Sequence, residues 1–142
     1  GGIGLAVIVE WSSGYGERRE AESAQAKAEG AEFGATASAA ACQGEALNRG
    51  PAVCNDVQFE CMVDAASFMR ACLEVAPRAL DTCAGVPPRE DRLWLEARCA
   101  ERGYPGSVNC MKVFEGGLQR FCEDSEPAAA PAGVPNKPPV PG

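Results

Sequence analysis

Eight cysteines are the residues of this 142-residue chain with the clearest capacity for chemistry. Cysteine sulfurs can ligate a metal, attack a substrate or pair as disulfides. Zinc sites usually need closely spaced cysteine pairs, often with histidine, but this chain has no histidine and no two cysteines closer than Cys54 and Cys61. An even number of widely spaced cysteines instead predicts four disulfides in an oxidising compartment. The eight are Cys42, Cys54, Cys61, Cys72, Cys83, Cys99, Cys110 and Cys122.

No arrangement of residues in the sequence is typical of an enzyme active site. Without histidine the chain lacks the usual general base near neutral pH, and a Ser-His-Asp or Cys-His arrangement is impossible. The sequence contains neither a phosphate-binding loop nor a calcium loop. The neighbouring acids Glu90/Asp91 and Glu123/Asp124 are best explained as helix-end and surface charges. We therefore expect a non-catalytic protein without a metal or cofactor.

Turns in the sequence suggest how the cysteines pair. Pro51, Pro77 and the dipeptide Tyr104-Pro105 each lie about midway between two cysteines. Residues at equal distances on either side of a turn face each other in an αα-hairpin, so each turn should join the cysteines that flank it. Other connectivities stay open, because eight cysteines can pair in many ways. The hypothesis predicts the disulfides Cys72–Cys83, Cys99–Cys110, Cys42–Cys61 and Cys54–Cys122.

The first helix expected in the cysteine-containing region runs from Pro51 to Ala76. Pro51 suits a first helical position, and the proline that follows Ala76 ends the helical pattern. Cys54, Cys61 and Cys72 would share one stripe of this helix, because steps of 7 and 11 residues each return to within about 20° of the same direction.

Three further helical segments are expected. A short one covers residues 78–84, the next runs from Pro87-Pro88 to Gly103, and the last covers 108–122 with Ser107 as its N-cap. The last segment has an amphipathic stripe of large apolar residues. These residues are Met111, Phe114, Leu118 and Phe121. The fold class that follows is all-α: a small disulfide-stapled bundle of αα-hairpins.

Large apolar residues are few, because much of the hydrophobic composition is alanine. A core this thin should use every aromatic side chain of the cysteine-containing region. The alternative is that these side chains line a cavity for a lipid or another small ligand. The aromatic residues concerned are Phe59, Phe68, Trp94, Phe114 and Phe121.

Residues 1–16 form an apolar N-terminal segment. The nine residues before Glu10 are too few to span a bilayer, which takes about 20. Three interpretations stay open: the second half of a membrane helix, a buried strand or packed segment, and the remnant of a signal peptide. Residues 12–16 predict a flexible break. The residues expected to contact a membrane or a partner are Ile3, Leu5, Val7, Ile8, Val9 and Trp11.

Three regions follow this segment. Residues 17–34 are charged and alanine-rich, which predicts a solvated helical spacer. Residues 35–124 form the eight-cysteine helical domain, and residues 125–142 are expected to be an extended Pro/Ala-rich tail. The net charge is −7 and no basic patch occurs in the sequence, so nucleic acid is not an expected partner.

These features together predict a non-catalytic, extracytoplasmic structural or accessory subunit of a membrane-associated or cell-surface assembly. Its apolar segment and its tail would attach it to other protein subunits, and residues 1–11 could also contact a membrane. Two other functions stay open: a secreted disulfide-rich binding module, such as an inhibitor or a lipid or small-ligand carrier, and a repeating subunit of a surface filament. The excess of arginine over lysine and the richness in Ala, Gly and Pro favour a bacterial periplasm or cell surface.

Overall fold

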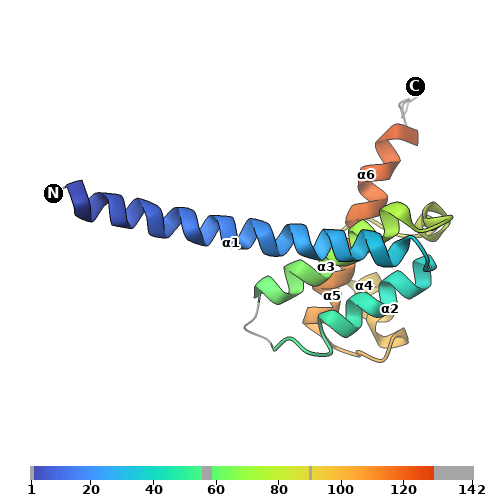
Figure 1. Ribbon diagram of the computed structural model, residues 1–142. Coiled ribbons are helices and arrows are strands. Elements are labelled where there is room, and N and C mark those ends of the chain that lie inside the picture. The colour runs from blue at the N-terminus through green and yellow to red at the C-terminus, as the bar shows by residue number, and fades with distance from the viewer. Residues whose placement is uncertain (1, 56–58, 90, 130–142) are drawn as a thin grey trace, which may run out of the picture.

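The computed structural model contains helices and no strand in the part of the chain that it describes (Figure 1). It describes the backbone of residues 2–55, 59–89 and 91–129 and the side chains of residues 16–55, 59–89 and 91–125. The predicted all-α, disulfide-stapled fold is therefore confirmed. The helices are α1 (Gly2–Gly34), α2 (Ala39–Arg49), α3 (Phe59–Val75), the 3-10 helix η1 (Ala79–Cys83), α4 (Arg92–Glu101), α5 (Val108–Phe114), the π-helical turn η2 (Glu115–Gln119) and α6 (Arg120–Ala129).

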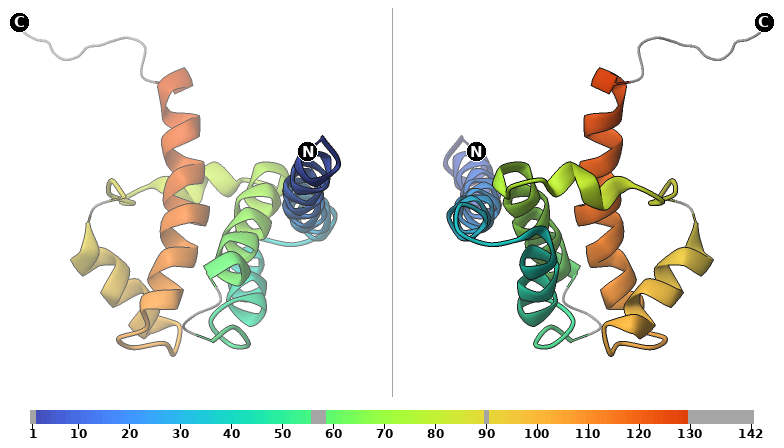
Figure 2. Two further views of the ribbon diagram at one scale, coloured as in Figure 1. Left: turned by 90° about the vertical axis from the view of Figure 1, so that its left-hand side faces the viewer. Right: turned by 90° about the vertical axis from the view of Figure 1, so that its right-hand side faces the viewer.

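Helix α3 lies at the centre of the molecule and packs against α1, α2, α5 and η2. Figure 2 shows α1 on one side of α3 and the continuous α5–η2–α6 helix on the other. The largest fully buried side chains come from α3 and from the α5–η2–α6 helix. The predicted apolar stripe of residues 108–122 is confirmed, because all four of its members are buried. Its Ser107 N-cap is confirmed as well, since the hydroxyl accepts a hydrogen bond from the Cys110 amide.

The five aromatic residues do not share one environment. Phe68, Phe114 and Phe121 belong to the core, whereas Trp94 is partly buried and Phe59 is 63% exposed. Phe59 opens α3 and lies under the ammonium group of Lys112, 5.6 Å from its ring centre. The expectation that all five aromatic side chains form the core is therefore wrong for Phe59. Smaller residues, including buried alanines and all four disulfides, fill the space between the helices.

The four disulfides connect different helices from those expected. They are Cys42–Cys72, Cys54–Cys61, Cys83–Cys122 and Cys99–Cys110. Only the predicted Cys99–Cys110 pair is confirmed, across the turn between α4 and α5. The predicted pairs Cys72–Cys83, Cys42–Cys61 and Cys54–Cys122 are wrong.

The main cause of these errors is the start of the central helix, which was expected at Pro51. Gly50 instead begins a tight turn, in which its carbonyl accepts hydrogen bonds from the amides of Val53 and Cys54. Helix α3 starts only at Phe59, so Cys54 lies outside it and the expected stripe of three cysteines does not form. Cys61 then closes the short loop to Cys54.

Helix α1 packs unusually closely on α3. A Cβ atom at Gly30 would lie 2.4 Å from the carbonyl oxygen of Phe68, and one at Gly34 would lie 2.3 Å from that of Cys72. Together with the buried Ala26, these residues form a stripe with a spacing of four that lets the two backbones touch. Residues 17–34 are helical, as predicted, but the face that carries Ala26, Gly30 and Gly34 packs on α3, so the second half of α1 is part of the domain.

The break expected over residues 12–16 is also absent, because α1 continues without interruption from Gly2 to Gly34. At 1.5 Å per residue this helix is about 50 Å long. Figures 1 and 2 show that its first half, residues 2–16, leads away from all the other helices. The strand interpretation of residues 1–11 is wrong for residues 2–11, whose backbone is helical.

The boundaries of η1, α4 and α6 can each be compared with the sequence prediction. The short segment 78–84 is confirmed as η1, whereas α4 begins after Pro87-Pro88 at Arg92, where the Asp91 side chain accepts a hydrogen bond from the Trp94 amide. Helix α6 continues to Ala129, so the tail expected from residue 125 is helical over its first five residues. The remainder of the predicted tail, 130–142, lies outside the described residues.

The disulfide pattern can be tested by non-reducing tryptic mapping of the full chain. We expect peptide 28–49, which contains Cys42, to be linked to peptide 71–78, which contains Cys72. The peptide containing Cys83 should be linked to the one that begins at Phe121. A link between the peptides containing Cys72 and Cys83 would instead support the pairing expected from the turns.

The close approach of α1 to α3 predicts that Gly30→Ala is destabilising. The added methyl group must push the two helices apart, and overpacking of this kind costs about 1–3 kcal/mol of unfolding free energy. Gly16→Ala is the matched control, because no atom lies within 4 Å of a Cβ at that position of the same helix. It should stabilise by about 0.5–1 kcal/mol through helix propensity. Equal unfolding free energies for the two variants in denaturant titrations would contradict the backbone contact.

Candidate functional site

The residues expected to contact a partner all lie on the first half of α1. Their side chains lie outside the described residues, and the helical backbone places them on the segment that leaves the domain (Figure 1). Among the described helices, none is both long and apolar enough to cross a membrane. The residues are Ile3, Leu5, Val7, Ile8, Val9 and Trp11.

The eight cysteines have a structural position in the fold. Each is paired in a disulfide, and none is a free thiol. Among the described side chains, those of residues 16–55, 59–89 and 91–125, no three from His, Cys, Asp or Glu come together in a way that could hold a metal ion. The four disulfides indicate an oxidising, extracytoplasmic environment.

An open groove of about 920 Å³, which we call the α3 groove, lies on the described surface. Its floor is one face of α3 and runs from Phe59 to Val75, about 24 Å at the rise of an α-helix. One wall is the second half of α1, from Ser23 to Ala31. The other wall comes from α5, η2 and the start of α6. The apolar part of the lining consists of Ala28, Ala31, Phe59, Met62, Val63, Ala66, Ala71 and Val75.

Charge in the α3 groove is predominantly positive, in contrast to the net charge of −7 of the whole chain. Two of its five cations are engaged: Arg70 pairs with Glu74 and Asp124, and Arg89 pairs with Glu123. Within the described residues, no ion pair joins the other three cations to an acid. They are Lys27 on the α1 wall and Lys112 and Arg120 on the opposite wall.

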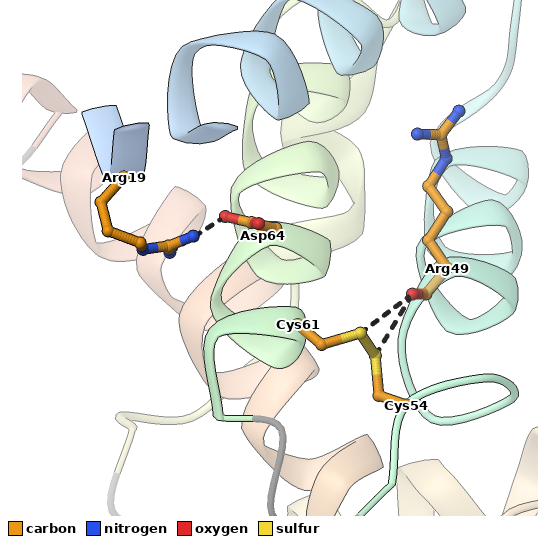
Figure 3. The surroundings of a disulfide bond; sticks show 5 residues. All are labelled: Arg19, Arg49, Cys54, Cys61 and Asp64. Atoms are coloured by element: carbon orange, nitrogen blue, oxygen red, sulfur yellow. Dashed lines mark hydrogen bonds and ion pairs between the residues drawn. A yellow bond between two sulfur atoms is a disulfide. The ribbon is translucent and has the colours of Figure 1, made fainter. Parts of the chain in front are cut away.

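Ion pairs hold α1 against α3 where the helix leaves the domain. The Arg19 guanidinium donates a hydrogen bond to Asp64 of α3 at 3.3 Å (Figure 3). It also pairs with Glu22 and Glu60. Donation to Glu22 and then to Asp64 raises the pKa of Arg19 above its ordinary value. Arg19 and Asp64 are half-buried, whereas Glu22 and Glu60 are exposed, so the two exposed acids add little to stability.

Arg49 connects three elements at the end of α2. Its guanidinium pairs with Glu29 of α1 at 2.6 Å and lies 4.0 Å from the ring centre of Phe68 on α3. Hydrogen bonds from Gln25 and then Arg49 hold the pKa of Glu29 below its ordinary value. The Arg49 carbonyl oxygen lies 3.5 and 3.9 Å from the sulfurs of the Cys54–Cys61 disulfide, which is a close contact without a donor hydrogen (Figure 3).

Arg98 of α4 and Arg102, the residue that follows α4, share one buried amide of α2. The Oε1 atom of Gln43, a residue 1% exposed, accepts hydrogen bonds from Arg98 at 2.9 Å and from Arg102 at 3.1 Å. Burial, and then the positive charge of Arg98, lower the pKa of Arg102. A neutral amide thus joins two cations, and this fixes α2 to α4, which no disulfide connects.

The π-helical turn η2 shapes the far wall of the groove. Gly116 and Gly117 lie against Ala66 and Met69 of α3, with no room for a Cβ at Gly117. The buried Gln119 donates hydrogen bonds to the carbonyls of Pro87 and Pro88 at 3.2 and 3.0 Å. These bonds hold the loop that carries Arg89 over the groove.

No protein-family model, curated protein or solved structure matches this chain. The candidate site therefore rests on the chain's own geometry. It consists of two surfaces: the first half of α1 and the α3 groove. Sequence reasoning identified the first through its apolar run and missed the second. The only available signals were the small residues Ala26, Gly30 and Gly34 at a spacing of four.

The Gln43 bridge predicts a loss of stability for Gln43→Met. Methionine has a similar size but leaves both guanidinium groups without their buried acceptor, which should lower the unfolding free energy by about 1–3 kcal/mol. Gln43→Glu is the matched control, because a carboxylate keeps the acceptor. Two neighbouring cations depress the folded-state pKa of that carboxylate, so its contribution should persist at pH 7 and be lost as the pH falls through that pKa. Urea titrations at pH 7 and pH 3 measure both effects, and a Gln43→Met variant as stable as the parent would disprove the bridge.

Proposed function

We propose that this protein is a non-catalytic, extracytoplasmic structural subunit, attached to a membrane-associated or cell-surface assembly by the first half of α1. One observation carries the proposal: α1 is a single 33-residue helix whose second half is fixed on α3 and whose first half leaves the domain. A helix that continues beyond its own domain presents a long surface to something else.

The composition of the projecting half supports attachment. Residues 2–16 contain one charged residue, Glu10, and six large apolar ones. At 100° per residue the apolar positions are spread around the helix rather than along one stripe, and a helix that is apolar all round is normally covered on several sides. The domain covers only the second half of α1, from about Arg19 onward.

The mode of fixation supports a mechanical role for the domain. Arg19, Arg49 and the glycine stripe hold α1 to α3, and the Cys42–Cys72 disulfide ties α3 to α2. A load on the first half of α1 would pass directly into this disulfide-braced core. Four disulfides favour an oxidising, extracytoplasmic location. The excess of arginine over lysine and the richness in Ala, Gly and Pro favour a bacterial periplasm or cell surface within that class.

Photo-crosslinking of the full chain in cells that produce it tests the proposal. A photoreactive residue in place of Leu5 or Ile8 should give adducts of higher mass, because these positions would be in contact with a partner. Leu93, which is 79% exposed on α4, is the control position and should give few adducts. Equal, low yields from positions 5, 8 and 93 would contradict attachment through α1.

A further inference from the structure

The α3 groove has the features of a helix-binding surface. Its floor is apolar apart from Ser67, Arg70 and Glu74 and is about as long as four to five helical turns. Its walls are themselves helices. Phe59 and Val75, at the two ends of the floor, are 63% and 46% exposed. Large apolar side chains exposed along one continuous groove are typical of helix-in-groove recognition.

The charges around the groove indicate what kind of helix fits. Lys27 on one wall and Lys112 and Arg120 on the other are paired with no acid in the described part of the chain. Cations on both rims of an apolar floor suit an apolar helix that carries an isolated negative charge. They disfavour a basic helix, which would face like charges at close range.

The first half of α1 has these properties. Residues 2–16 extend about 22 Å as a helix, which matches the length of the groove floor. Their single charge is the carboxylate of Glu10, set among apolar residues. An acid in such a segment needs a cation when water is removed, because an unpaired buried charge is costly.

The groove cannot receive the first half of α1 from its own chain. Its wall from Ser23 to Ala31 is the second half of the same continuous helix, and the first half leads away from it (Figure 1). Folding back would require a break in α1. The occupant must therefore come from another molecule.

We propose that the α3 groove binds the first half of α1 of a second copy of this chain. The donor helix would lie between the acceptor's α1 and its α5–η2–α6 helix, with Glu10 close to the cations of the rims. Donor and acceptor surfaces are different parts of the molecule, so each copy can use both at once. Contacts of this type add copies head to tail into a ring or a filament.

This inference rests on the proposed attachment through α1 and names the partner. Sedimentation velocity of the full chain over a range of concentrations tests it. We expect reversible self-association that weakens by about tenfold or more in the groove variant Lys112→Glu/Arg120→Glu and in the helix variant Ile8→Glu. Arg92→Glu, a single charge reversal on exposed α4 outside the groove, should associate like the parent. Circular dichroism and the unfolding temperature should be the same for all variants.

Mixing the groove variant with the helix variant provides the sharper test. The groove variant keeps an intact donor helix and the helix variant keeps an intact groove, so together they should form a one-to-one complex that neither forms alone. Absence of that complex, a monomeric parent at about 200 µM, or unchanged association of the groove variant would each overturn the proposal.

Mapping the adducts from position 8 separates this inference from the proposed function. Adducts on groove peptides of a second copy, such as the one containing Met62, would support both. Adducts only on lipid or on a different protein would overturn the groove proposal and leave attachment through α1 intact. A lack of adducts from position 8 would contradict both.

Discussion

The contact between the backbones of α1 and α3 is the constraint on which the rest of the structure depends. Gly30 and Gly34 bring α1 against the carbonyls of Phe68 and Cys72, closer than any side chain would permit. At this distance the axis of α1 is fixed relative to the domain, and so is the direction of its first half. The same contact makes the second half of α1 a wall of the α3 groove. The positions of both surfaces of the candidate site thus depend on these two glycines.

The disulfides reinforce this arrangement. Alanine-rich helices bury little apolar area, so α3 gains limited stability from its neighbours through packing alone. Cys42–Cys72 ties α2 to α3, and Cys83–Cys122 ties the first turn of α6 to the end of η1. In chain-entropy terms, loops of 30 and 39 residues lose more freedom in the unfolded state than the short loop of 7 residues between Cys54 and Cys61. The symmetry of the turns predicted neither of the two long closures.

Local signals predicted the helices better than their partners. Ser107, Pro77 and the stripe from Met111 to Phe121 act within one or two turns of helix, and their consequences are visible in the sequence. The Gly50 turn was missed because Pro51 also suits the first turn of a helix. The packing at this position involves residues distant in sequence, since a Cβ at Gly50 would lie 2.9 Å from Ala65 and 3.2 Å from Val113. Because α3 starts at Phe59, Cys54 is not helical, and the pairing predicted for a helical Cys54 was wrong.

In the candidate site, too, the feature that is local in sequence was predicted and the feature that depends on long-range contacts was not. The projecting apolar segment is continuous in sequence, so composition alone indicated a contact surface. The α3 groove combines residues as distant as Lys27, Phe59 and Arg120, and nothing in the sequence brings them together before α1, α3 and α6 are placed. Its positive charge was also hidden, because the chain as a whole is acidic and the cations are scattered along it.

The segment Ser12–Gly16 determines how stable the helix is between the two halves of α1, and therefore how readily the first half can dock. Two glycines and two serines lower helix stability there by roughly 3 kcal/mol relative to alanine. An isolated helix as short as residues 2–16 would be marginal in water, but this one extends a helix already nucleated on α3. The free energy gained when the first half of α1 docks must therefore compensate only for the low helix propensity of Ser12–Gly16. That cost reduces the affinity between copies without changing their geometry, because a continuous α1 keeps the direction set at Gly30 and Gly34.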